Sequence, residues 1–97
     1  FLTLASLFVE RSAHALAAIQ TAVAAQDLPA LVKEAHKLKG SAMEFCARPS
    51  VAAAAALEES ARKAAVQDLA ALGERVRAEV ERLTAALVEI MEKGFPS

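Results

Sequence analysis

The chain has 97 residues, a hydrophobic fraction of 56% and a net charge of −1, which suits one small domain with a buried core. The balanced charge excludes the strong positive field that would draw a protein to nucleic acid or to an anionic membrane. A single cysteine excludes an internal disulfide and most zinc sites, and fits a reducing compartment. Few glycines and prolines, together with abundant alanine, favour long helices over a sheet.

The first half of the chain predicts two helices. Apolar residues recur at intervals of three and four over about residues 3–25 and again over about 28–46. Asp27 is placed to cap the second helix, and Pro29 falls in its first turn, where a missing N–H does no harm. Pro49 should break the second helix, and Ser50 is a suitable cap for the next one.

The second half predicts two further helices, an alanine-rich one from residue 51 to about 64 and a longer one after Asp68. Gly94 and Pro96 should stop the last helix. The connections are short, so successive helices should be antiparallel, and residues 1–97 are expected to form a single all-α domain, an up-down-up-down four-helix bundle. No apolar run is long enough to span a bilayer, so we expect no membrane contact by this domain.

One histidine stands out in the second predicted helix. His36 follows the apolar position Ala35, so it should lie on the shoulder of the buried stripe and be partly exposed. Residues three, four and seven apart share one side of a helix. The neighbours expected around His36 are Lys33, Lys37, Lys39, Gly40 and Met43.

These residue types suit phosphoryl chemistry. A neutral imidazole nitrogen is a nucleophile, and histidine is neutral for much of the physiological pH range. Lys39 is expected to be exposed and can neutralise phosphoryl oxygens as a charged donor. A glycine in the middle of a helix, such as Gly40, lowers helix stability by about 1 kcal/mol relative to alanine. The close approach of a partner would explain why glycine stands at this position. Lys33 and Lys37 either add positive potential or are ordinary solvated charges.

The segment Ala35-His36-Lys37-Leu38-Lys39-Gly40-Ser41-Ala42 resembles the phosphoacceptor signature of histidine-phosphotransfer domains, which reads His, any residue, Leu, Lys, Gly, Ser, Ala. Residues 56–62 also resemble the Leu-Glu segment in the second half of that family's hairpin, and the resemblance covers nearly the whole chain. It implies that His36 accepts a phosphoryl group from a receiver-domain aspartate and passes it to another. It also implies that Lys39 holds the phosphoryl group and that Gly40 gives access.

The same resemblance sets expectations for partners and cofactors. The partners would be response-regulator receiver domains, with a histidine kinase in the same or another chain as a further one. The domain would hold no cofactor, and the Mg²⁺ of the reaction would belong to the receiver. We expect a cytoplasmic domain cut from a larger signalling protein, such as a hybrid sensor histidine kinase, and a membrane anchor in that parent protein stays open.

Two residues depart from the family pattern, which often has glycine where Met43 and Cys46 stand. Met43 would narrow access to His36 or serve as an adaptable contact, which bears on partner preference. Cys46 is expected to be a small buried residue rather than a reactive thiol.

Other functions remain open on the sequence alone. One is a P1-type phosphoacceptor domain of a chemotaxis-like kinase, which would use the same His-Lys-Gly surface. Another is a non-catalytic helical interaction module, in which His36 would be incidental. Acid–base catalysis has no support, because Glu58 and Glu59 are adjacent on a helix and should point apart. His14 lacks a Lys-Gly companion and is expected to be a packing or surface residue.

Overall fold

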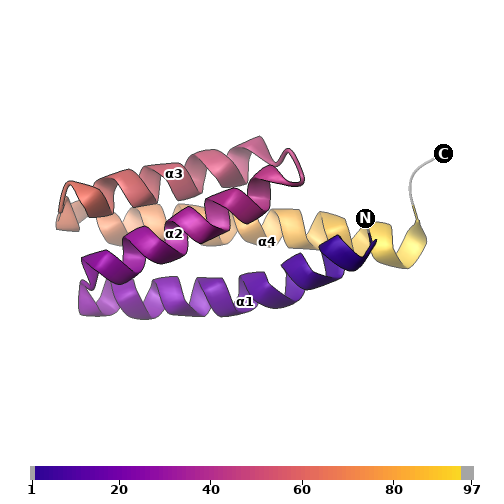
Figure 1. The fold of residues 1–97 in the computed structure, drawn as a ribbon, viewed down its shortest axis with the longest axis horizontal. Coiled ribbons are helices and arrows are strands. Elements are labelled where there is room, and N and C mark those ends of the chain that lie inside the picture. The colour runs from indigo at the N-terminus through magenta and orange to yellow at the C-terminus, as the bar shows by residue number, and fades with distance from the viewer. Residues whose placement is uncertain (1, 95–97) are drawn as a thin grey trace.

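The computed structural model describes residues 2–94, which form four α-helices, with no strand in this part of the chain. The helices are α1 (Leu2–Ala25), α2 (Leu28–Met43), α3 (Arg48–Arg62) and α4 (Leu69–Lys93), and a 3₁₀ turn, η1 (Val66–Asp68), precedes α4. Successive helices run antiparallel, and each packs against two others in the cyclic order α1, α2, α3, α4 (Figure 1). The predicted all-α, up-down-up-down bundle is confirmed.

The bundle combines a long pair of helices with a short pair. Helices α1 and α4 have 24 and 25 residues, whereas α2 and α3 have 16 and 15. The long pair therefore extends past the α2–α3 turn at one end of the molecule, which measures 46 × 20 × 18 Å (Figure 1). The short α2–α3 hairpin carries the histidine motif and its surroundings.

The core is made of a few large aliphatic side chains separated by alanines. Fully burying a leucine or valine contributes roughly 1.5–3 kcal/mol, and the alanines between them let the helices approach closely. Ala35, Ala53 and Ala54 are completely buried. The largest fully buried side chains are Leu31, Leu57, Leu69, Val76 and Val80. This packing fixes which side of α2 faces solvent.

Helix α2 begins as predicted and ends early. The Asp27 carboxylate accepts a hydrogen bond from the Ala30 amide at 3.2 Å, which caps the first turn. The helix stops at Met43 rather than at the expected Cys46, because Cys46 adopts a left-handed φ of 53°. The Cys46 amide donates to the carbonyl of Met43, which closes the turn.

The expected cap at Ser50 is wrong. Helix α3 begins earlier, at Arg48, with Ala47 in the cap position and no side-chain capping bond. Pro49 lies in the first turn, where its missing N–H costs no hydrogen bond, so it starts the helix instead of delaying it. Ser50 is buried, and its hydroxyl donates to the backbone carbonyl of Glu79 in α4 at 3.2 Å. The serine therefore ties α3 to α4.

A residue with positive φ comes shortly after the end of each of the last two helices. Helix α3 stops at Arg62, two residues before the predicted end, and Ala64 has a φ of 56°. Asp68 occupies the cap position of α4 as expected, but its side chain makes no capping hydrogen bond. Gly94, with a φ of 80°, ends α4 as predicted, whereas Pro96 lies outside the described residues.

Helix α1 corrects the expectation that no segment could span a bilayer. It is long and apolar enough to do so by length and composition, with a mean hydropathy of 1.2 over its most apolar 18 residues. The many alanines of α1 raise its mean hydropathy, although each alanine contributes only one methyl group of apolar surface. The helix packs against α2 and α4 and buries Phe8 and Ile19 between them. Helices that pack in a bundle can share this length and composition with helices that cross a membrane, and 22% of the apolar stretch of α1 is buried in the fold.

Candidate functional site

His36 projects from the outer side of α2. Ala35 and Leu38, on either side of it in sequence, are buried and fix α2 against the core. The imidazole is consequently directed to solvent, and the side chain is 64% exposed. The predicted position on the shoulder of the apolar stripe is confirmed.

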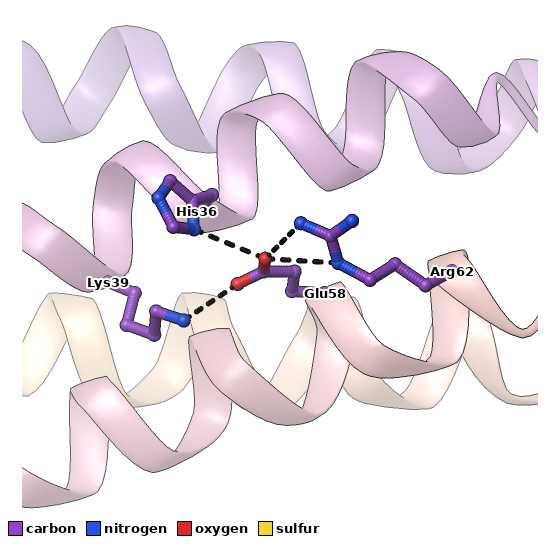
Figure 2. A network of polar contacts seen from close by, with 4 residues as sticks. All are labelled: His36, Lys39, Glu58 and Arg62. Atoms are coloured by element: carbon purple, nitrogen blue, oxygen red, sulfur yellow. Dashed lines mark hydrogen bonds and ion pairs between the residues drawn. The ribbon is translucent and has the colours of Figure 1, made fainter.

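A carboxylate from α3 lies directly beside the imidazole. The Nδ1 atom of His36 is 3.2 Å from Oε2 of Glu58 (Figure 2). Glu58 follows the fully buried Leu57, and only 8% of its side chain is exposed. A covered carboxylate needs charged or hydrogen-bonding partners, because desolvation disfavours its ionised form.

Lys39 is one of these partners. Its ammonium lies 3.0 Å from Oε1 of Glu58, and its side chain is only 28% exposed. We expected an exposed lysine, but the ion pair draws the side chain down between α2 and α3. No aligned hydrogen bond from the described residues reaches Oε1, so this contact is an ion pair. The histidine and the lysine of the motif therefore meet at one carboxylate.

Arg62, one turn after Glu58 on α3, completes the group (Figure 2). Its Nη2 and Nε atoms donate to Oε2 of Glu58 at 2.7 and 3.2 Å. The pKa of Glu58 is lowered to about 2, first by the hydrogen bond from Arg62 and then by the contact with the Lys39 ammonium, against the opposing effect of burial. The contact with His36 lowers it further.

Glu58 is covered by its partners rather than by depth in the core. The side chains of His36 and Arg62 are 64% and 58% exposed, so solvent reaches the far side of both. The carboxylate is ionised at neutral pH and can only accept hydrogen bonds. In a neutral imidazole, the nitrogen facing it must therefore carry the proton, which leaves the lone pair on Nε2.

The other predicted site residues share the exposed surface of α2 but not this polar network. Lys33 and Lys37 are exposed, and Lys37 lies 3.9 Å from Glu34, as a solvated pair would. Met43 is 59% exposed. A methyl group added at Gly40 would meet nothing within 4 Å, so the space beside this position is open. The roles assigned to these residues stay predictions.

Two residues set aside by the sequence analysis are both on the surface. Cys46 is exposed, contrary to the expected buried position, because it forms the left-handed residue after α2 instead of a further helical turn. Glycine adopts this conformation most easily, which is a physical reason for the glycine that the resemblance led us to expect at this position. His14 is exposed on α1, in agreement with a surface role.

Glu58 is the residue that sequence reasoning missed. The sequence analysis includes it in the Leu-Glu segment and in an adjacent carboxylate pair with Glu59 but assigns it no role in the site. The two side chains do point apart, since Glu59 is 67% exposed. The sequence feature that could have identified Glu58 is its helical spacing from apolar residues of α3. Ala54 and Ala61, four before it and three after it, are buried, so Glu58 falls on the inner side of α3.

The comparison with protein families agrees with this geometry. The family model described as Hpt domain matches residues 3–86. The chain therefore belongs to the Hpt domain family, whose members transfer phosphoryl groups through a histidine in phosphorelays and interact with receiver domains. No match was found among curated proteins or among solved structures.

Replacing Gly40 by alanine is expected to stabilise the domain and slow its reaction. Gly40 lies in the last turn of α2, where alanine is favoured over glycine by up to about 1 kcal/mol, and the added methyl group clashes with none of the described residues. The same methyl group would obstruct a partner approaching His36 and slow transfer from a phosphorylated receiver domain by about tenfold.

Gly73→Ala is the matched control for this variant, because its added carbon would only touch the side chain of Val23 at 3.4 Å. Thermal unfolding and transfer rates would be measured on both variants. Equal transfer by Gly40→Ala and Gly73→Ala would contradict an access role for Gly40.

Proposed function

We propose that this domain is a phosphocarrier, in which His36 accepts a phosphoryl group from a receiver-domain aspartate and passes it to a second receiver aspartate. The observation that carries the proposal is the contact between Nδ1 of His36 and the buried, ionised Glu58. It keeps the proton on Nδ1 and leaves Nε2 of an exposed ring as the nucleophile.

The reaction needs no proton transfer at the attacking atom. The Nε2 lone pair attacks phosphorus, the N–P bond forms, and the P–O bond to the donor aspartate breaks, which releases a carboxylate. The phosphorylated ring keeps its Nδ1 proton and carries a positive charge. Glu58 lies beside that charge and stabilises it. Transfer to the next aspartate reverses these bond changes.

The surrounding residues supply charge and space. Lys39 lies close enough to the ring's carboxylate partner to turn toward phosphoryl oxygens, and Gly40 leaves room for the donor. Lys33, Lys37 and Met43 form the exposed surface on which a receiver would rest. We assign Mg²⁺ to the receiver's site and no cofactor to this domain. Its place would be the cytoplasm, within a larger signalling protein.

The test is transfer from a purified receiver domain that has first been phosphorylated with acetyl phosphate and freed of the reagent. The label should move to this chain and be stable in base and labile in acid, as expected of phosphohistidine. A chain that receives no such label from any receiver of its own organism would overturn the proposal. Labelling only by an ATP-bound kinase domain would instead indicate the P1-type acceptor.

A further inference from the structure

The Glu58 carboxylate divides its contacts unequally between its two oxygens. Oε2 accepts from Nδ1 of His36 and from two nitrogens of Arg62, at 3.2, 3.2 and 2.7 Å. Among residues 2–94, the charged group paired with Oε1 is the ammonium of Lys39, at 3.0 Å. The two positive side chains therefore hold opposite oxygens of one carboxylate (Figure 2).

Lys39 is thus engaged before any phosphoryl group arrives. The group would be attached to Nε2, on the side of the ring away from the nitrogen that faces Glu58. An ammonium that turns to meet it loses or stretches its contact with Oε1. While the phosphoryl group approaches the still neutral ring, Glu58 would then keep Arg62 as its one fixed positive partner, with a new double negative charge nearby.

We propose that Arg62 is a positioning residue for phosphoryl transfer, which holds Glu58 ionised and oriented against His36 while Lys39 turns from Glu58 to the phosphoryl group. This inference rests on the proposed function. Arginine suits the task, because its planar guanidinium donates through two nitrogens at once and keeps its charge at any physiological pH. The guanidinium of Arg62 binds Oε2 of Glu58, the oxygen that also contacts His36, and leaves Oε1 to Lys39.

Without Arg62, the covered carboxylate would lose the partner that most lowers its pKa. A departing Lys39 would leave it facing an imidazole and a phosphoryl group, and uptake of a proton would then be favoured. Protonated Glu58 can donate a hydrogen bond to Nδ1 and move the lone pair to the wrong nitrogen. The damage should therefore grow as the pH falls.

The test compares Arg62→Ala with Lys63→Ala, using potassium phosphoramidate as a donor that needs no partner protein. Lys63 forms the equivalent exposed pair with Glu59, at 2.9 Å and also one turn apart, and serves as the matched control. In this reaction Nε2 attacks phosphorus and the P–N bond to the leaving ammonia breaks. Arg62→Ala should label His36 about tenfold more slowly than wild type at pH 7.

The ratio of the Lys63→Ala labelling rate to the Arg62→Ala labelling rate should increase further between pH 7 and pH 5. The Arg62→Lys variant should recover part of the lost rate, because lysine keeps the positive charge. Circular dichroism would verify folding of each variant. An Arg62→Ala chain with the rate and pH profile of Lys63→Ala would overturn this inference and leave the proposed function intact. A wild-type chain that takes no label on His36 would instead overturn both.

Discussion

Replacing His36 by glutamine is expected to abolish the acid-labile label completely. The chain has two histidines, and only His36 combines an exposed ring with a carboxylate that fixes its tautomer. Glutamine has no nucleophilic nitrogen, because its amide lone pair is delocalised. The side chain is mostly exposed and the glutamine amide can still donate to Glu58, so the substitution should change the free energy of unfolding by no more than about 1 kcal/mol. Transfer from a phosphorylated receiver domain would measure the loss.

His14→Gln is the control for this prediction. His14 is also exposed, on α1, but none of the described acidic side chains forms an ion pair with it. This variant should be labelled at the wild-type rate. If the label survives in His36→Gln and disappears in His14→Gln, the acceptor is His14 on α1, and the basis of the proposed function is removed.

The fold could be predicted from the sequence because its signals are local. Apolar spacing of three and four residues sets each helix, and the cap at Asp27 sets the start of α2. The errors occurred where two local signals competed. Pro49 is compatible both with the end of one helix and with the first turn of the next. In the structure it lies in the first turn of α3.

The site could be predicted only in part, because half of it comes from another helix. His36, Lys39 and Gly40 lie within five residues, so their shared surface follows from helix geometry. Glu58 and Arg62 belong to α3, and their approach to His36 depends on how α2 and α3 pack. That packing also explains why Lys39 is covered, since a partner 19 residues away cannot be seen in the spacing of one helix.

Glu58→Gln is expected to slow phosphorylation of His36 by about a hundredfold. The carboxylate can only accept a hydrogen bond from Nδ1, whereas the glutamine amide can also donate one. Donation would favour the tautomer with its proton on Nε2 and remove the nucleophilic lone pair. The variant also lacks the negative charge that faces the phosphorylated ring. Rates of labelling by phosphoramidate would measure the effect, with Glu59→Gln as the control on the adjacent, 67% exposed residue.

The same variant tests the charge state of Glu58 through stability. The pKa of this carboxyl is lowered from 4.5 to about 2 in the fold, first by Arg62 and then by Lys39, so the folded state binds the proton less readily than the unfolded chain. Its contribution to stability is complete above about pH 4.5 and is lost as the pH falls through about 2. Solvation of His36 and Arg62 limits the contribution to about 1–2 kcal/mol.

Wild type should therefore lose about 1–2 kcal/mol more stability than Glu58→Gln between pH 5 and pH 2, as measured by urea unfolding at each pH. Other carboxylates titrate in both proteins and cancel in this difference. Parallel stability curves for the two proteins would mean that the Lys39 and Arg62 contacts do not hold Glu58 ionised in solution. A hundredfold loss of labelling would then have to come from the hydrogen bond that the glutamine amide donates to His36 rather than from the missing charge.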